Sequence, residues 1–329
     1  MTLLSPIGKK ALIIGISGQD GVYLSKFLLS KGYEVFGTSR NISDDRIDAL
    51  KSFDLLEKIN LIKADPSNFI DVSAFVKDVE PDEIYNLSGQ SSVGLSFDKP
   101  LETFSSIALA TINILEAIRI TNKNIKFYNA GSGEMFGNTG DKAAVEDTPL
   151  NPVSPYGHAK ASATMQVSSY RSTYGMHACT GILFNHESPL RPEQYVTQKI
   201  IRAACRIGSG SKEKLLLGNI NISRDWGYAA EYVEAMWAML QCDEPQDIIV
   251  ATGHTSSLEY LTQKAFHYFN LDWKDHVKVD KTLLRDSEII TGIADPSKAE
   301  SILGWKASYS LDDVINIMIK DTLKSEEFL

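Results

Sequence analysis

Three polar residues in the middle of the sequence form a combination that can oxidise an alcohol. Tyr156 and Lys160 are four residues apart in a predicted helix, so both side chains lie on one helical face. We expect the charge of Lys160 to lower the pKa of the Tyr156 phenol, which makes tyrosinate available as a base near neutral pH. Ser132 follows a predicted strand and can donate a hydrogen bond to the same substrate oxygen. Together they predict oxidation of a secondary alcohol by a nicotinamide cofactor.

Glu134 adds a carboxylate to this group and changes the predicted reaction. It lies two residues beyond Ser132, on the same side if the strand continues. Once an alcohol carbon has become a ketone, the neighbouring C–H is acidic, and a carboxylate can remove that proton and protonate a departing hydroxyl. A dehydratase needs this carboxylate, whereas a dehydrogenase or epimerase does not. The structural alternative is a carboxylate that caps a nearby loop.

A glycine motif near the start of the chain predicts where the cofactor binds. Gly15, Gly18 and Gly21 lie in GISGQDG, between a β-rich run and a helical pattern. Glycine permits a tight turn and close approach to a pyrophosphate, and the helix N-terminus supplies free N–H donors. An ordinary tight turn is the alternative. Further expected contacts are Ser17, Gln19 and Asp20 in the turn, Asp65 and Pro66 after the third strand, and Leu87, Gly89, Gln90 and Ser91 after the fourth.

The end of the second predicted strand favours NADP over NAD. Strands of this type that bind NAD end in an acidic residue for the ribose 2′-hydroxyl, but this one ends Gly-Thr-Ser-Arg without a carboxylate. Arg40, helped by Ser39 or Asn41, can receive a 2′-phosphate through charge-assisted hydrogen bonds. The alternative is a solvated surface arginine.

The elements that must position these residues alternate along the chain. Short, mostly apolar runs are predicted as strands over 11–16, 33–39, 59–65, 82–88, 125–131 and 178–184, and helices over 21–31, 68–79, 101–122, 156–174, 196–208, 229–241, 257–269 and 311–324. This rhythm predicts an α/β protein, with a Rossmann-like doubly wound parallel sheet and a smaller α/β substrate-binding domain. We expect the dinucleotide-binding domain over 1–185, with a return around 225–255, and the substrate-binding domain over 186–224 and 256–329.

Composition narrows the class of protein. With 329 residues and a hydrophobic content of 43%, the chain can bury one large core or two smaller ones. The net charge of −9 gives no support for a nucleic-acid or membrane-surface partner, which would require a basic face. No signal core or membrane span is expected, so we predict a cytoplasmic protein. The three cysteines show no CxxC spacing, and we expect no metal site.

The sequence resembles the GDP-mannose 4,6-dehydratase family over nearly its whole length. The similarity includes ALIIGISGQDG, PDEIYNLSGQS, SPYGHAK, GILFNHESPLR, LGNINISRDWG and DPSKAESILGW, of which NHESPLR and RDWG are the most specific. The resemblance implies a homodimer or homotetramer that uses NADP to oxidise C4 of GDP-mannose, eliminate water across C5 and C6, and reduce C6. Alternatives are a GDP-heptose 4,6-dehydratase, a GDP-sugar epimerase or reductase on the same scaffold, and a non-catalytic NADP-binding protein.

The resemblance also assigns site residues. It implies Ser132, Glu134 and Tyr156 as catalytic, with Lys160 assisting at the nicotinamide ribose, and His186 and Arg191 on the cofactor side. The residues implied around the GDP-sugar are Ser91, Asn185, Val196, Lys199, Gly218, Asn219, Arg224, Arg285 and Glu288. Structural alternatives are an Arg224–Asp225 ion pair and an Arg285–Glu288 pair on a helix surface.

Four positions depart from the usual family pattern. Gly133 removes a side chain beside the sugar, which is expected to enlarge the pocket towards a bulkier sugar such as a heptose. Asn41 replaces the second residue of an Arg-Arg pair, in a segment that also serves tetramer contacts in relatives. Pro192 and Gln198 replace glycine and arginine, which removes one positive charge near the expected diphosphate.

Overall fold

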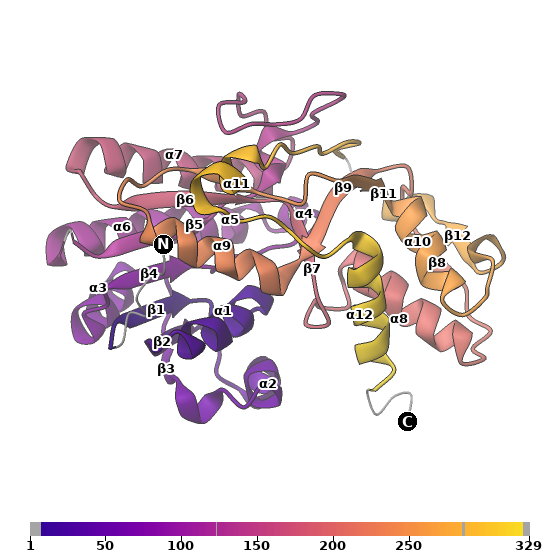
Figure 1. Cartoon of the computed structure of the whole chain (residues 1–329), viewed down its shortest axis with the longest axis horizontal. Helices are drawn as coiled ribbons and strands as arrows, with labels where there is room; N and C mark the ends of the chain where they lie inside the picture. The colour runs from indigo at the N-terminus through magenta and orange to yellow at the C-terminus, as the bar shows by residue number, and fades with distance from the viewer. Residues whose placement is uncertain (1–7, 123, 285–286, 325–329) are drawn as a thin grey trace.

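Seven parallel strands form the central sheet of the computed structural model, which describes residues 8–122, 124–284 and 287–324 (Figure 1). The strand order is β10-β6-β5-β4-β1-β2-β3. The order reverses between β1 and β4, and ligands of open α/β sheets bind at such a point. The predicted doubly wound fold is confirmed. The strands are β1 (Lys10–Ile14), β2 (Glu34–Ser39), β3 (Asn60–Lys63), β4 (Glu83–Asn86), β5 (Lys126–Ala130), β6 (Ala178–Leu183) and β10 (Ile248–Val250).

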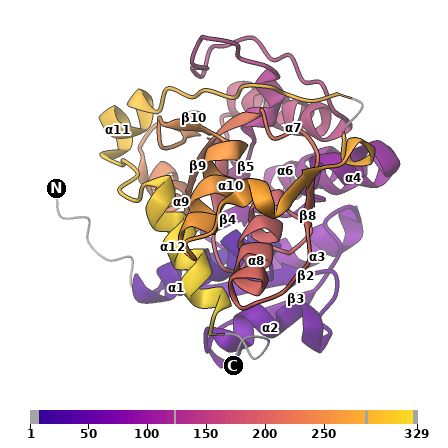
Figure 2. The same ribbon diagram turned by 90° about the vertical axis from the view of Figure 1, so that its right-hand side faces the viewer.

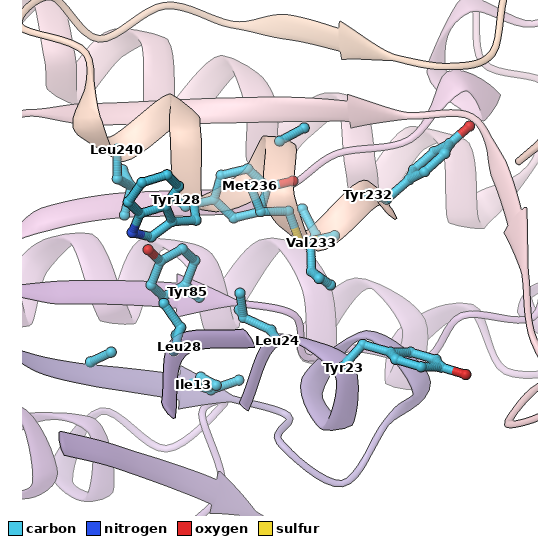
Figure 3. Packing of buried hydrophobic residues seen from close by; sticks show 14 of the residues in the cluster. Ile13, Tyr23, Leu24, Leu28, Tyr85, Tyr128, Tyr232, Val233, Met236 and Leu240 are labelled. Atoms are coloured by element: carbon cyan, nitrogen blue, oxygen red, sulfur yellow. The ribbon is translucent and has the colours of Figure 1, made fainter. Parts of the chain in front are cut away.

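Helices cover both faces of this sheet, and the side chains of each strand divide between two cores. On one face α1 (Gln19–Ser30) packs against α9 (Ala229–Gln241). On the other, α6 (Ala110–Thr121) lies between α3 (Phe69–Val79) and α7 (Pro155–Tyr174). Because successive strand residues point to opposite faces, Ile13 of β1 joins the α1/α9 core while Ile14 joins the α3/α6/α7 core. Figure 3 shows the first core, where side chains of α1 and α9 meet Tyr85 and Tyr128 of the sheet.

The smaller part of the molecule contains two further sheets and a helical cluster with its own core. β7 (Asn185–Glu187), β9 (Ser223–Tyr228) and β11 (Thr255–Ser257) form one sheet, and β8 (Leu215–Leu217) pairs with β12 (Val277–Val279). α8 (Val196–Gly208), α10 (Leu258–His267) and α12 (Leu311–Thr322) pack together at the end of the molecule that faces the viewer in Figure 2. In the sequence between α8 and α10, the chain returns to the large sheet and forms α9 and β10. The residue boundaries of the two domains stay a prediction.

The predicted strands and long helices are all present, but several short elements were missed. The expected helix over 101–122 consists of α5 (Pro100–Phe104), a π-helical turn over 105–109 and α6. Three-residue strands are too short to show the period-2 alternation on which a strand prediction depends. The helices without a sequence prediction are α2 (Asp44–Ser52), α4 (Val93–Asp98) and α11 (Ser297–Leu303).

One helical run, Pro100–Thr121, has the length and apolar composition of a membrane-spanning helix. In this structure the run packs against α3 and α7 in the helical layer, and 56% of its most apolar window is buried. Its composition is therefore explained by packing within the fold.

A buried carboxylate connects several residues at the amino-terminal ends of the strands of the large sheet. Glu83, at the start of β4, is fully buried. It accepts hydrogen bonds from the hydroxyl groups of Tyr33 (3.0 Å) and Tyr85 (2.7 Å), and it pairs with the ammonium of Lys9 (3.3 Å). Burial and the neighbouring Glu83 carboxylate raise the pKa of both tyrosines, so each remains a donor at neutral pH.

Replacing Glu83 by glutamine should lower the free energy of unfolding by about 1.5–3 kcal/mol, the range for a hydrogen bond to a charged group. The carboxylate accepts hydrogen bonds from two tyrosine hydroxyl groups. The glutamine amide would place an NH₂ donor where one of these bonds is accepted, so that hydrogen bond would be lost. Chemical denaturation checks the value, with Glu57→Gln on the exposed surface as the matched control. An unfolding curve for Glu83→Gln that matches the control would contradict this account.

Candidate active site

A cavity of about 350 Å³ opens at the carboxyl edge of the large sheet, where the loops after β4, β5 and β6 meet the smaller sheet. Parallel strands bring their carboxyl ends to one edge, so residues far apart in the sequence gather there. The predicted site residues that line the cavity are Asp20, Leu87, Gly89, Gln90, Ser91, Ser132, Glu134, Tyr156, Lys160, Asn185, His186, Arg191, Val196, Lys199, Gly218, Asn219, Arg224 and Glu288.

A tight turn after β5 brings Ser132 and Glu134 into the cavity. The strand does not continue to Glu134, the condition under which the sequence placed it on the same side as Ser132: β5 ends at Ala130, and Gly133–Phe136 form a 3-10 turn. Ser132 caps this turn, because its Oγ accepts a hydrogen bond from the Glu134 backbone N–H at 3.2 Å. The hydroxyl hydrogen of Ser132 therefore stays available for donation.

The first two turns of α7 carry Tyr156 and Lys160 into the same cavity. Ser154 caps the helix by accepting a hydrogen bond from the Gly157 N–H at 3.0 Å, and Pro155 occupies the first helical position. Both Tyr156 and Lys160 are buried. The Lys160 ammonium donates to the carbonyl of Ala130 at 2.7 Å and lies 5.8 Å from the centre of the Tyr156 ring.

Burial dominates the ionisation of this pair. It raises the pKa of Tyr156, while the hydrogen bond with Ser132 and the charge of Arg191 act in the opposite direction. The expected lowering of the Tyr156 pKa by Lys160 is therefore wrong for this arrangement, in which the ammonium bonds to a backbone carbonyl. Burial also lowers the pKa of Lys160 to about 8, because the charged form loses its hydration.

Arg224 lies beside Glu134 in the cavity. The guanidinium Nε of Arg224, on β9, lies 3.8 Å from a carboxylate oxygen of Glu134. The neighbouring Asp225 is turned to the other side of β9, where its carboxylate accepts hydrogen bonds from Thr252 and Gly253. A proton-transfer group and a cation thus share one wall of the cavity.

Gly133 does not open extra space beside the catalytic residues, contrary to the sequence-based expectation. A Cβ at this position would lie 3.0 Å from the ring of Phe184, which stacks against Phe136. The Phe184 ring therefore occupies the direction in which a side chain would point, and the predicted enlargement of the pocket is wrong.

The glycine turn after β1 has the shape that a dinucleotide site requires. Gly15 has φ of 90°, and a Cβ there would meet the loop after β4 at 3.0 Å. Gly21 is equally restricted, since its Cβ would lie 2.5 Å from a backbone carbonyl. Gly18, by contrast, has φ of −78°, and its Cβ would meet only one atom, at 3.4 Å. The fold itself therefore does not require glycine at position 18. A glycine there is required if an anion approaches the N-terminus of α1 closely.

The residues predicted for the adenosine end lie outside the cavity, beside the ends of β2 and β3. Arg40 is exposed directly after β2, and Ser17 and Ser39 lie 3.2 Å apart, which joins the glycine turn to the same strand. Asp65 accepts hydrogen bonds from the backbone and hydroxyl of Ser67, and the Pro66 carbonyl accepts one from Asn113. Gln19, also outside the cavity, donates to the His186 carbonyl at 3.1 Å.

Two charge pairs border the cavity between the glycine turn and the smaller sheet. His186 Nε2 lies 2.9 Å from the carboxylate of Asp20, and Arg191 Nε lies 3.1 Å from that of Glu187. Burial disfavours both charges of the first pair, yet the mutual attraction prevails, so the pKa of His186 is raised and that of Asp20 is lowered. Each cation is therefore compensated by its own carboxylate.

The remaining predicted positions have four different outcomes. Lys199 lines the cavity and donates to the Leu216 carbonyl at 2.7 Å. Arg285 lies outside the described residues, so its pairing with Glu288 stays a prediction. Pro192 and Gln198 do not line the cavity, and Gln198 is only 2% exposed, so the expected loss of a charge beside the diphosphate stays a prediction. Asn41 is exposed and accepts a hydrogen bond from the Ser43 backbone.

The cavity residues that sequence reasoning missed include three with polar or aromatic side chains, Glu187, Tyr195 and Trp226. Glu187 and Trp226 lie inside NHESPLR and RDWG, which were recognised as specific without roles for these two side chains. Tyr195 directly precedes the predicted Val196, but a single tyrosine in a loop has no spacing pattern. Within the described ranges, no three His, Cys, Asp or Glu side chains gather in a way that could hold a metal ion.

Comparison with known proteins gives the family. The model of the GDP-mannose 4,6 dehydratase family matches residues 12–318. The chain belongs to this family. It is 43% identical to GDP-mannose 4,6 dehydratase 1 of Arabidopsis thaliana, with 96% of this chain and 90% of the relative covered. It is 38% identical to GDP-mannose 4,6-dehydratase of Vibrio cholerae, with 96% and 94% covered.

Solved structures with the same fold include proteins that are named for other sugar nucleotides. The family member described here resembles dTDP-glucose 4,6-dehydratase from Bacillus anthracis in complex with NAD, with a TM-score of 0.85, 18% identity, and 97% and 98% of the two chains covered. It resembles the UDP-glucose 4-epimerase of Thermus thermophilus, also in complex with NAD, with a TM-score of 0.83, 20% identity, and 96% and 99% covered. At this identity the likeness shows the fold alone.

The Asp20–His186 pair predicts a pH-dependent contribution to stability. The raised pKa of His186 means that this contribution is complete below the ordinary histidine value of 6.5 and is lost as the pH rises through the folded-state value. Because the pKa of Asp20 is lowered, the contribution to stability is fully present above the ordinary aspartate pKa of 3.8. Asp20→Asn should therefore cost about 1.5–3 kcal/mol between these two values and less at higher pH.

Thermal denaturation of Asp20→Asn and the parent chain across this pH range checks the window. Asp141→Asn, on an exposed loop, is the matched control. A stability difference that does not depend on pH would show that the two side chains are not coupled.

Proposed function

We propose that this chain is a GDP-mannose 4,6-dehydratase that converts GDP-mannose to GDP-4-keto-6-deoxymannose. The observation that carries the proposal is the Glu134 carboxylate, which a capped turn holds in one cavity with Ser132 and Tyr156. An oxidoreductase acting on the same sugar would need the hydroxyl groups but not the carboxylate. The names and sequence identity of the relatives support the substrate.

The proton movements follow from the positions of three side chains. Ser132 donates a hydrogen bond to the C4 oxygen, and Tyr156, as tyrosinate, takes the C4 hydroxyl proton. After C4 has become a ketone, Glu134 removes the C5 proton and delivers it to the departing C6 hydroxyl, which leaves as water. One carboxylate serves as base and then as acid, so it returns to its starting state. Reduction of C6 requires one proton at C5, and the Tyr156 phenol can return there the proton that it took from the C4 hydroxyl, so both side chains end in their starting states. Burial raises the pKa of Tyr156 in the chain alone, so the tyrosinate form is proposed for the complex with cofactor and substrate.

NADP is the proposed cofactor, and the glycine turn and the end of β2 support it. Gly18 leaves the N-terminus of α1 open to a pyrophosphate, Arg40 stands where a 2′-phosphate would bind, and Lys160 and His186 border the nicotinamide side. When bound, the nicotinamide supplies the reversible two-electron redox chemistry that C4 and C6 require.

Replacing Arg40 by alanine should weaken NADP binding roughly ten- to hundredfold and leave NAD binding unchanged, because only NADP carries the 2′-phosphate. Equilibrium binding of both cofactors measures the difference. Lys58→Ala, which removes another exposed positive charge, is the control. Equal weakening of NADP and NAD would contradict the assignment.

The diphosphate of the substrate is proposed to bind between α8 and β9. Lys199 and Arg224 supply positive charge, and Asn219 and Glu288 can bond to the nucleotide. Arg224 also approaches Glu134, so the same guanidinium links the nucleotide end of the cavity to the reacting end.

Glu134→Gln should reduce conversion of GDP-mannose about 10²- to 10⁴-fold, the range for a positioned acid–base group, while NADP and GDP still bind. Mass spectrometry after incubation with GDP-mannose and NADP checks it: the parent chain should give a product lighter by one water. Glu244→Gln, on the surface, is the matched control. A parallel incubation with a GDP-heptose tests the larger sugar.

If only the GDP-heptose loses water, the substrate is the GDP-heptose and not GDP-mannose. No loss of water from either sugar would overturn the dehydratase assignment. Full dehydration by Glu134→Gln would show that another group performs the elimination.

A further inference from the structure

Tyr195 lines the cavity and contacts Ser91 from another part of the fold, although neither sequence pattern nor the proposed mechanism gives it a role. It directly precedes α8 in the smaller part of the molecule. Its hydroxyl lies 2.6 Å from the hydroxyl of Ser91, which follows β4 in the large sheet. One hydrogen bond therefore joins the loop after β4 to the start of α8, and both residues line the cavity.

Both ends of this bridge are held in place. The loop that carries Ser91 is bonded through Gln90, whose backbone N–H donates to Ser106 and whose side chain donates to Thr103, each at 3.1 Å. The Arg191 guanidinium lies 4.0 Å from the centre of the Tyr195 ring, within the range of a cation–π contact. Arg191 is itself paired with Glu187. The phenol is thus positioned before any ligand binds.

The phenol belongs to the reacting end of the cavity rather than to its nucleotide end. Tyr195 lines the same cavity as Ser132 and Glu134, and it is close enough to Tyr156 to raise the pKa of that phenol. In the proposed binding mode the nucleotide lies at Lys199, Asn219 and Arg224, so the sugar is the part that meets Tyr195.

We propose that Tyr195 is a substrate-positioning residue whose hydroxyl, anchored by Ser91, donates a hydrogen bond to a hydroxyl group of the hexose. Ser91 can donate to the phenolic oxygen and leave the phenolic hydrogen for the sugar. The inference rests on the proposed GDP-sugar function and adds the residue that holds the hexose against Ser132, Glu134 and Tyr156.

The test compares Tyr195→Phe with the parent chain in equilibrium binding of GDP-mannose and of GDP, in the presence of NADP. The phenylalanine ring still packs beneath Arg191, so only the hydroxyl is lost. We expect GDP-mannose to bind about five- to tenfold more weakly, and GDP, which has no hexose, to bind unchanged. Tyr260→Phe is the control, because that hydroxyl bonds to Asp312 at 2.9 Å, away from the cavity.

A double-mutant cycle with Ser91→Ala tests the anchoring. If Ser91 acts through Tyr195, Ser91→Ala should have little further effect on GDP-mannose binding in the Tyr195→Phe background. Fully additive effects would overturn the anchoring role of Ser91.

Unchanged GDP-mannose binding by Tyr195→Phe, or equal weakening for GDP and GDP-mannose, would overturn the inference without touching the proposed function. A parent chain that binds GDP-mannose but releases no water would instead overturn the proposed function, while the Tyr195 comparison would still decide the role of the phenol. A parent chain that does not bind GDP-mannose would overturn both.

Discussion

The hydrogen bond from the Glu134 N–H to Ser132 Oγ is the contact on which the rest of the site depends. It turns the chain at the end of β5, so a hydroxyl group and a carboxylate two residues apart enter one cavity. Because Ser132 accepts this bond, its own hydrogen can point to the substrate. The residue between them, Gly133, has no side chain, and the Phe184 ring occupies the space that a side chain would need. A short turn, rather than an extended strand, therefore unites oxidation and elimination in one site.

Charge compensation explains how such a buried site remains stable. Unpaired charges in a closed cavity would be costly, and here Asp20 lies beside His186 and Glu187 beside Arg191. The Lys160 ammonium donates to a backbone carbonyl instead, and burial lowers its pKa. The site can therefore hold cations close to an anionic substrate and cofactor without a large net charge of its own.

The sequence predicts the fold well because the strands are buried on both faces and read as continuous apolar runs. Spacing also identified Tyr156 and Lys160, since positions four residues apart on a helix share a face wherever that helix packs. Glu134 was found for an incorrect geometric reason, because strand periodicity cannot show where a 3-10 turn begins. The effect of Gly133 was misjudged because it depends on Phe184, which is distant in sequence. Tyr195 was missed because its bond to Ser91 exists only in the folded chain.

The most direct test of the central claim uses GDP-mannose that carries deuterium at C4. If this chain oxidises C4, eliminates water across C5 and C6 and then reduces C6 within one catalytic cycle, the 4-keto-6-deoxy product should carry that deuterium at C6. NMR and mass spectrometry of the product locate the label. A dehydrated product without the deuterium, or a labelled sugar that keeps its deuterium at C4, would contradict the account.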